Sequence, residues 1–323
     1  MVIAADRKRV LITGGAGFIG SHVVDYQMVQ GHSVTVYDNL ISGRLESLAQ
    51  HRDNPRFRFV EGDLLQVNRL EEAMIGHDLV WHLGGNTDIQ LGNRVTDHDL
   101  KNCTIGTANV LKAMRTFGVK EVIFASSSTV YGNTRGKRMV EEQGSMLPIC
   151  FYGAGKLACE GLLSSYAHLF GIRSWVFRFG NVVGARMGHG VIHDFIKKLQ
   201  CNPRKLIILG DGTQEKPFFT VDDCIDGMLT ICRNAQLDAD TPCAVFNLGP
   251  TTTTRISEVA QIVIEEMGLS DVMMQYAGGR QGWRGDVPEV RLDVNKAKAA
   301  GWEARNTSDE AVRTAVRRLL RKQ

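Results

Sequence analysis

The sequence of 323 residues has no hydrophobic run long enough to cross a membrane. Runs such as Val122-Ile123-Phe124-Ala125 are far shorter than the roughly 20 residues of a spanning helix. The first residues lack the layout of a secretory signal, because charged residues follow a short apolar piece. The net charge of +3 is too small to indicate a nucleic-acid partner. Seven cysteines, an odd number without Cys-x-x-Cys spacing, favour buried thiols in a cytoplasmic protein, and we predict no metal site.

Strand and helix patterns alternate through the first half of the chain. Apolar residues at helical spacing, such as Val110, Leu111 and Met114, separate short runs of mostly apolar residues. Those runs are predicted strands: Val10-Leu11-Ile12, Val34-Thr35-Val36-Tyr37, Phe57-Arg58-Phe59-Val60, Leu79-Val80-Trp81, Val122-Ile123-Phe124 and Trp175-Val176-Phe177. The alternation predicts an α/β fold, a Rossmann-type doubly wound parallel sheet covered on both faces.

After Gly180 the pattern loosens, and helices are expected near residues 191–199, 222–233, 256–267 and 308–322. The length allows about two domains. We predict a Rossmann domain over residues 1–180, with a returning segment near 217–250. Residues 181–216 and 251–323 are expected to form a smaller α/β C-terminal substrate domain.

A glycine-rich turn follows the first predicted strand, in Thr13-Gly14-Gly15-Ala16-Gly17-Phe18-Ile19-Gly20. Gly14, Gly17 and Gly20 allow a tight turn and a close approach of the backbone to a pyrophosphate. The phosphates would then bind at the free N–H groups where the next helix begins. The position of this turn, between a strand and a helix, predicts a dinucleotide site.

Two aspartates follow the next two strands. Asp38 stands where a carboxylate can accept hydrogen bonds from both ribose hydroxyls of an adenosine. It would repel a 2′-phosphate, so NAD is favoured over NADP, although Arg44 lies close enough to weaken that preference. Asp63 is a candidate for binding the adenine amino group or, equally, an ordinary turn aspartate.

A second motif, Tyr152-Gly153-Ala154-Gly155-Lys156, places a phenol and an amine four residues apart, and therefore on one face of a helix. A phenol with a pKa near 10 is a poor base, but a neighbouring ammonium favours the phenolate. The pair can then take a proton from an alcohol while hydride leaves for the cofactor. The run Ser126-Ser127-Ser128 ends a predicted strand, where one hydroxyl can hold the reacting oxygen.

These residues resemble the extended short-chain dehydrogenase/reductase superfamily, and within it the UDP-galactose 4-epimerase-like nucleotide-sugar epimerases. The resemblance covers nearly the whole chain. Besides the motifs above, it rests on Asp38-Asn39-Leu40, Gly62-Asp63-Leu64, His82-Leu83-Gly84-Gly85-Asn86, Thr129-Val130-Tyr131-Gly132, Arg178-Phe179-Gly180-Asn181, Val221-Asp222-Asp223 and Gly285-Asp286-Val287-Pro288.

The resemblance implies a mechanism and roles for three catalytic residues. Ser127 is the catalytic hydroxyl, with Ser128 as its nearest competitor; Tyr152 is the acid/base; and Lys156 binds the nicotinamide ribose. Hydride leaves sugar C4, the 4-keto intermediate rotates, and hydride returns to its other face, so that bound NAD is regenerated. A homodimer is also implied.

The resemblance also implies the binding residues. The cofactor would contact Gly14, Gly17, Phe18, Ile19, Gly20, Asp38, Asn39, Leu40, Gly43, Asp63, Leu64, Leu83, Gly84, Gly85, Tyr152, Lys156 and Phe179. The UDP-sugar would contact Asn86, Ser127, Ser128, Asn181, Arg186, Val191, Lys216, Arg284 and Asp286.

The positions after Ser127 help to choose among relatives. Dehydratases and decarboxylases of this superfamily carry an acid there, whereas this chain has Ser128-Thr129. Simple 4-epimerisation is therefore favoured, with UDP-glucose/UDP-galactose as the first expectation. Arg186 could pair with a carboxylate, which leaves UDP-glucuronate as an alternative. UDP-N-acetylhexosamine epimerisation, net oxidoreduction and non-catalytic NAD binding remain further alternatives.

Four positions depart from the pattern of this family. Gly155 and Cys150 stand where relatives often have serine, and Cys103 stands where an asparagine is usual. Lys216 replaces an arginine that often meets the nucleotide phosphates. None of these departures removes a catalytic group, so they bear on pocket contacts and affinity.

Overall fold

The computed structural model describes residues 7–86 and 88–321, and the chain folds into two compact units. The first unit comprises the residues up to Ser126, together with Gly155–Phe177 and Gln236–Val245. The second comprises Ser127–Ala154, Arg178–Ala235 and the residues from Phe246 onwards. Within the described residues, no helix is both long enough and apolar enough to span a membrane.

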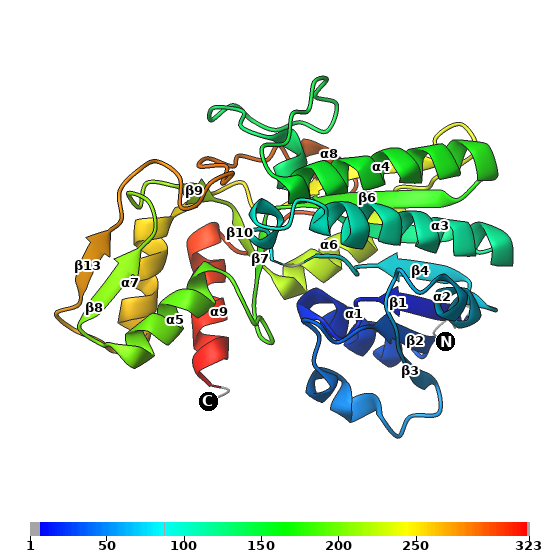
Figure 1. Ribbon diagram of the computed structural model, residues 1–323, viewed down its shortest axis with the longest axis horizontal. Helices are drawn as coiled ribbons and strands as arrows, with labels where there is room; N and C mark the ends of the chain where they lie inside the picture. The colour runs from blue at the N-terminus through cyan, green and yellow to red at the C-terminus, as the bar shows by residue number, and fades with distance from the viewer. Residues whose placement is uncertain (1–6, 87, 322–323) are drawn as a thin grey trace. The chain divides into compact units, whose positions relative to one another are not determined.

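A seven-stranded sheet has the strand order β11-β6-β5-β4-β1-β2-β3 (Figure 1). Strand β1 pairs in parallel with β2 and β4, β2 with β3, and β4 with β5. The strands are β1 (Arg9–Thr13), β2 (Ser33–Asp38), β3 (Phe57–Glu61), β4 (Leu79–His82), β5 (Glu121–Ser127), β6 (Arg173–Phe179) and β11 (Cys243–Leu248). The six strands predicted from apolar runs are confirmed, and so is the Rossmann-type fold class.

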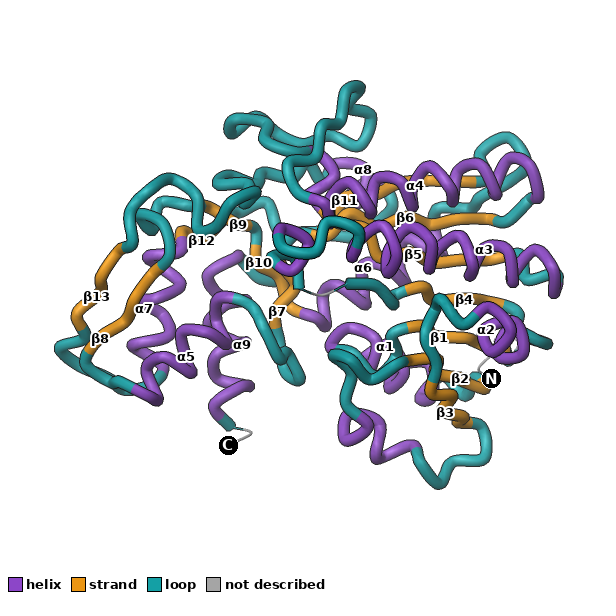
Figure 2. The backbone as a smooth tube through the Cα atoms, in the orientation of Figure 1, coloured by secondary structure: helices purple, strands orange, loops and turns teal. Residues whose placement is uncertain are grey.

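Helices cover both faces of this sheet (Figure 2). Leu11, Val80 and Phe124 share one buried cluster with residues of α2 (Val67–Met74), α3 (Gly106–Phe117) and α4 (Phe151–Phe170). Successive strand residues point to opposite faces, so Val10 and Ile12 face the other side, where α1 (Phe18–Val29) packs against β1 and β2. The middle residues of the central strands are therefore buried on both faces, which explains their short apolar runs.

The second unit has its own hydrophobic core. Three helices supply most of it, α5 (Val191–Cys201), α7 (Ile256–Glu266) and α9 (Ser308–Leu320), together with a few strand residues such as Leu206 and Phe218. The predicted helices are confirmed, except that Lys322, the expected end of the last helix, lies outside the described residues. The other elements are α6 (Val221–Asn234), α8 (Asn295–Ala299), and the strand pairs β7 (Asn181–Val183) with β10 (Phe218–Thr220), β8 (Lys205–Ile208) with β13 (Met273–Tyr276), and β9 (Glu215–Lys216) with β12 (Thr254–Arg255).

Short helical turns complete the two units. They are η1 (Leu45–His51), η2 (Leu91–Asn93), η3 (Leu100–Ile105) and η4 (Ser128–Tyr131). The turn η4 directly follows β5 and begins with Ser128, whereas η3 runs into α3.

A buried polar chain lies at the end of β4. The Nδ1 atom of His82 is 2.7 Å from Thr13 Oγ1, and its Nε2 atom is 2.9 Å from Thr107 Oγ1. All three residues are buried. Because hydroxyls both donate and accept, the two threonines satisfy a neutral imidazole. Burial, with a smaller effect from the positive Lys156, lowers the pKa of His82 to about 3.

Acid should destabilise the fold partly through His82. The unfolded histidine binds a proton below about pH 6.5, whereas the folded one binds it only near pH 3. Falling pH in this window therefore favours the unfolded state, by about 2 kcal/mol between pH 7 and pH 5. Urea unfolding at both pH values should show this loss in the wild type and in the exposed control His168→Gln. His82→Gln should show a smaller loss, and an equal loss would contradict the assignment.

Candidate functional site

The glycine-rich turn connects β1 to α1 through close backbone contacts. Gly14 has a φ of +67°, and a Cβ there would lie 2.7 Å from the backbone nitrogen of Gly84. A Cβ on Gly20 would lie 2.1 Å from the carbonyl oxygen of Gly14. Only glycine fits these two positions, so the end of β4 and the start of α1 both pack directly on the turn.

The start of α1 suits an anion. Gly17 precedes the helix and has no side chain to cap it, while the first N–H groups of a helix have no partner within it. The helix dipole adds a partial positive charge at this end. Phe18 and Ile19, which begin α1, therefore present N–H groups and charge that fit the pyrophosphate of a dinucleotide.

Asp38 ends β2 beside the same turn. Its Oδ2 accepts a hydrogen bond from the Ala16 N–H (3.0 Å), and its Oδ1 accepts one from the Leu40 N–H (2.8 Å). A Cβ on Gly43 would lie 2.7 Å from the Asp38 Oδ1 atom. Burial raises the pKa of Asp38, and the two backbone hydrogen bonds partly oppose this rise. Each carboxylate oxygen has further lone-pair capacity, so the residue fits the ribose role that its sequence position predicts.

Asp63 forms a turn after β3. Its Oδ1 accepts a hydrogen bond from the Leu65 N–H (2.9 Å), and its Oδ2 accepts one from Asn39 Nδ2 (2.8 Å). The side chain of Leu64 packs on Gly84, with its Cδ1 3.3 Å from where a Cβ on that glycine would lie. The structure thus shows the turn role of Asp63 and its link to Asn39, and the adenine contact stays a prediction.

Lys156 lies at the carboxyl end of β5 within the first unit. Its Nζ donates a hydrogen bond to the Ala125 carbonyl oxygen (2.7 Å), and the residue is only 5% exposed. A Cβ on Gly85 would lie 3.6 Å from Lys156 Nζ and 3.6 Å from Cys103 Sγ. The buried ammonium therefore lies against the turn that follows β4, where Leu83, Gly84 and Gly85 were predicted to contact the cofactor.

Two of the departures from the family pattern lie in contact with each other. A Cβ on Gly155 would approach the Cβ of Cys103 to 3.3 Å and the carbonyl oxygen of Asp99 to 3.3 Å. A serine at position 155 would therefore require a neighbour to move. The two unusual residues, Gly155 and Cys103, form one local packing arrangement.

Asn86 is held by its own neighbours. Its Nδ2 donates to Asp99 Oδ1 (2.8 Å) and to the Asp88 carbonyl oxygen (2.9 Å). Asp99 is 1% exposed, and its Oδ2 has no hydrogen-bond partner among the described residues. Sequence reasoning missed Asp99, because no local pattern predicts that Gly155 of α4 packs against it. The substrate role of Asn86 stays a prediction.

The three serines at the end of β5 and the start of η4 have different surroundings. Ser126 donates to Glu160 Oε1 (2.5 Å) in a buried contact. Ser128 is 6% exposed, whereas Ser127 is half-buried. The Ser127 Oγ accepts hydrogen bonds from the Thr129 N–H (3.2 Å) and from Thr129 Oγ1 (3.0 Å). Of the three, Ser127 has the hydroxyl best placed to meet a bound molecule.

A close backbone contact brings the start of α4 against this turn. A Cβ on Gly153 would lie 2.6 Å from the Thr129 carbonyl oxygen and 3.1 Å from the Cβ of Pro148. Tyr152 directly precedes Gly153, so the second unit brings Tyr152 next to the turn that carries Ser127. Lys156 follows one helical turn later on α4.

A buried network that sequence reasoning missed holds the other end of the turn. Arg178 Nη1 donates to the Tyr131 hydroxyl (2.8 Å), and that hydroxyl donates to Asn247 Oδ1 (2.8 Å). The Asn247 N–H donates to Glu141 Oε1 (2.7 Å). Burial raises the pKa of Tyr131 to about 12. The motifs containing Tyr131 and Arg178 were visible in the sequence, but Glu141 and Asn247 had no local signal.

Apart from Asn86, the predicted substrate residues lie in several segments of the second unit. Lys216 Nζ donates to Asp286 Oδ1 (2.7 Å) and to the Val287 carbonyl oxygen, so two predicted residues form one ion pair. Asn181 begins β7 beside Phe218 of β10. Phe179, predicted to contact the cofactor, ends β6 and meets the ring of Phe219 edge-on.

The remaining predicted substrate residues follow β7 and β13. Arg186 lies between β7 and α5 and has a φ of +67°. Val191 begins α5, and Arg284 lies in the loop before Val287. Both arginines have interaction partners within the protein.

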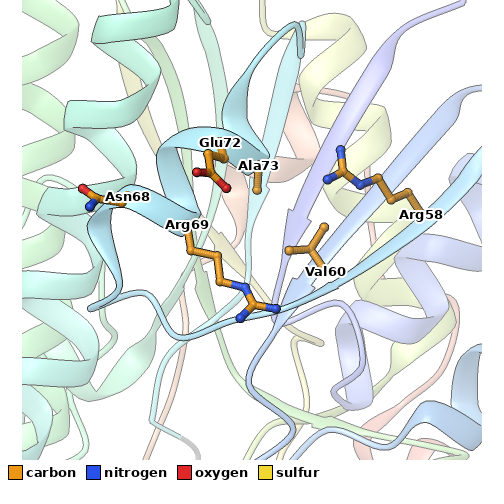
Figure 3. Close-up of a pocket in the computed structure, with 6 residues that line it drawn as sticks. All are labelled: Arg58, Val60, Asn68, Arg69, Glu72 and Ala73. Carbon is orange, nitrogen blue, oxygen red and sulfur yellow. The ribbon is translucent and has the colours of Figure 1, made fainter.

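A surface cavity of about 450 Å³ lies in the first unit (Figure 3). It is lined by residues of β3 and α2, and none of them belongs to the predicted site: Arg58, Val60, Asn68, Arg69, Glu72 and Ala73. Over the described ranges 7–86 and 88–321, no group of three or more His, Cys, Asp or Glu side chains could hold a metal ion.

Comparison with known proteins agrees with this arrangement. A provisionally named UDP-glucose 4-epimerase of Methanocaldococcus jannaschii is 31% identical over 316 residues, which is 95% of this chain and 97% of that protein. UDP-glucuronic acid decarboxylase 1 of Danio rerio is 32% identical over 92% of this chain and 69% of its own length. A crystal structure of UDP-galactose 4-epimerase superposes with a TM-score of 0.86 at 37% identity, covering 97% of this chain and 99% of that one.

A family model also matches residues 10–249, over the strands, turns and helices that carry the glycine turn, Ser127, Tyr152 and Lys156. That match spans more than half of the chain. The protein is thus a member of the NAD dependent epimerase/dehydratase family, and it resembles enzymes that act on nucleotide sugars.

Proposed function

We propose that this NAD-dependent nucleotide-sugar enzyme is a UDP-sugar 4-epimerase, with UDP-glucose and UDP-galactose as its substrates. One observation carries the proposal: Gly153 packs on the Thr129 carbonyl oxygen, which places Tyr152 beside the Ser127 turn. No carboxylate occupies positions 128 and 129 of that turn. Tyr152, on α4 beside this turn, is therefore the proposed acid/base. Although a decarboxylase is among the similar proteins, we do not propose decarboxylation for this chain.

Proton movement follows from the three side chains. The ammonium of Lys156, one turn along α4, favours the phenolate form of Tyr152. That phenolate accepts the proton of the sugar C4 hydroxyl, while the Ser127 hydroxyl holds the same oxygen. Bound NAD would supply the hydride acceptor for C4 and the hydride donor for the return step. Tyr152 would then give its proton back to the same C4 oxygen, which leaves C4 with the opposite configuration.

Binding of the cofactor is assigned to the first unit. The α1 N-terminus would hold the pyrophosphate, and Asp38 would accept the adenosine ribose hydroxyls. Lys156 would donate to the nicotinamide ribose. These assignments are supported by the uncapped start of α1, by the position of Asp38 at the same turn, and by the buried ammonium beside Gly85.

Binding of the nucleotide sugar is assigned to the second unit. Asp286 partly neutralises the charge of Lys216. The pair therefore offers a hydrogen-bond donor for the diphosphate and an acceptor for the ribose hydroxyls, rather than positive charge alone. Asn181 would contact the diphosphate and Val191 the uracil end. The homodimer and the cytoplasmic location stay predictions of the sequence.

A uronate substrate is the second candidate function. Arg186 adopts a left-handed backbone conformation in the loop before α5, which is uncommon outside glycine. A guanidinium there could bind a carboxylate with two hydrogen bonds. A relative that is 32% identical is a UDP-glucuronic acid decarboxylase, which supports testing this sugar.

Replacement of Tyr152 tests the catalytic assignment. Tyr152→Phe should lower kcat on the order of 10²–10⁴-fold, because general acid–base catalysis is lost. The matched control is Tyr166→Phe, which removes a hydroxyl farther along the same helix α4 and should leave kcat unchanged. Turnover can be followed by chromatographic resolution of the two epimers. Full activity of Tyr152→Phe would show that another group moves the proton.

A panel of nucleotide sugars tests the substrate. Purified protein should interconvert UDP-glucose and UDP-galactose without net production of NADH, because hydride is returned in each cycle. Chromatography of the UDP- and TDP-sugars after incubation measures the conversion, and absorbance at the NADH band measures net reduction. Conversion of UDP-glucuronate alone would select the uronate alternative. Stoichiometric NADH formation would replace epimerisation by net oxidoreduction.

Replacement of Asp38 tests the cofactor assignment. Asp38→Ala should bind NAD about 10- to 100-fold more weakly, since it loses hydrogen bonds between a charged group and the ribose. Affinity for NADP should fall less, because the carboxylate no longer repels a 2′-phosphate. Calorimetric titration of cofactor-free protein measures both affinities, with the exposed Asp53→Ala as control. Equal losses for the two cofactors would contradict a ribose contact at Asp38.

A further inference from the structure

The Ser127 hydroxyl accepts two hydrogen bonds from a single residue. The N–H and the side-chain hydroxyl of Thr129 both donate to Ser127 Oγ, at 3.2 and 3.0 Å. A serine hydroxyl has two acceptor lone pairs and one O–H donor. With both lone pairs engaged, the interaction that Ser127 can still make with a bound molecule is donation of its own proton.

We propose that Thr129 is a positioning residue that fixes Ser127 as a hydrogen-bond donor to the C4 oxygen of the sugar. The inference rests on the proposed function of Ser127. Thr129 then donates hydrogen bonds to Ser127, and Ser127 donates one to the sugar C4 oxygen. The proton of that oxygen goes to Tyr152. Ser127 therefore polarises the reacting oxygen without accepting its proton, and it does not relay protons between the sugar and the tyrosine.

The surroundings of Thr129 hold it in this orientation. Its carbonyl oxygen packs against the Cα of Gly153, where a Cβ would come within 2.6 Å. Two residues later, the Tyr131 hydroxyl is fixed by Arg178 and Asn247, each at 2.8 Å. The turn is thus anchored through its backbone at Thr129 and through a buried side chain at its end. Rotation of Ser127 away from Thr129 would give up both hydrogen bonds.

The burial of this anchor supports the assignment. Arg178 is 3% exposed and Asn247 is fully buried, while Tyr131 is 2% exposed. Buried polar groups are costly unless they are paired, and these three pair with one another and with the backbone of Met139 and Asp293. A buried polar network therefore holds Tyr131, two residues after Thr129. Such an anchor is expected where the Ser127 hydroxyl must keep one orientation.

The proposal predicts different effects for two substitutions at the same position. Thr129→Val keeps the shape and the backbone N–H but loses the hydroxyl donor, so kcat should fall about three- to tenfold while KM changes less than twofold. Thr129→Ser restores the hydroxyl and should restore kcat. Thr134→Val, which removes a hydroxyl that donates to the Lys137 carbonyl oxygen, is the matched control and should leave kcat unchanged. Urea unfolding shows whether each variant is folded.

A double-mutant cycle with Ser127→Ala separates positioning from structural damage. The penalty of Thr129→Val should disappear when Ser127 is absent, because Thr129 then has no hydroxyl to orient. An equal penalty in both backgrounds would overturn the inference, as would a wild-type level of kcat in Thr129→Val. These results leave the proposed function standing, because they require an active wild type. A wild type that converts no sugar in the panel would contradict the proposed function and this inference together.

A crystal structure with bound UDP-galactose gives a reading that does not depend on turnover. Ser127 Oγ should contact a sugar oxygen while both contacts to Thr129 are kept. A Ser127 side chain rotated away from Thr129 in that complex would overturn the inference.

Discussion

Parallel pairing of β1, β2, β4 and β5 is the constraint on which the candidate site depends. Parallel strands end on the same side of a sheet, and burial on both faces leaves only those ends able to present polar groups. Gly14 follows the last residue of β1, Asp38 ends β2, and Ser127 ends β5. The apolar residues of the strands fix where these groups lie, whereas the polar groups at the strand ends are the ones that can react or bind.

Close backbone contacts at two glycines hold the segments of the site together. Gly14 packs on the backbone of Gly84, and Gly153 packs on the carbonyl oxygen of Thr129. In both cases a Cβ on the glycine would collide with the neighbouring backbone. The glycines of the two motifs therefore have a packing role in addition to leaving room for a ligand. A methyl group at either place would push apart the segments that carry the candidate functional groups.

Buried charges in the structure are each held by specific polar partners. Lys156 donates to a backbone carbonyl oxygen, Asp38 accepts from two backbone N–H groups, and Arg178 donates to Tyr131. An unpaired buried charge would be strongly destabilising. Because these partners are fixed by the fold, each of these charged groups has a defined direction.

Apolar periodicity and glycine spacing are local properties of the chain, so they were enough to predict the element order, the parallel sheet and the residues of the candidate groups. The pairing of Asn86 with Asp99, the contact of Gly155 with Cys103, and the joining of Tyr131 and Arg178 to Glu141 and Asn247 came only from the tertiary structure. Those partners are separated by 13 to 116 residues, and no local pattern relates them. The same holds for Ser127: its position after a strand marked it as a candidate, but only the folded turn decided which of its hydrogen-bonding sites remains for a ligand, because Thr129 fills the other two.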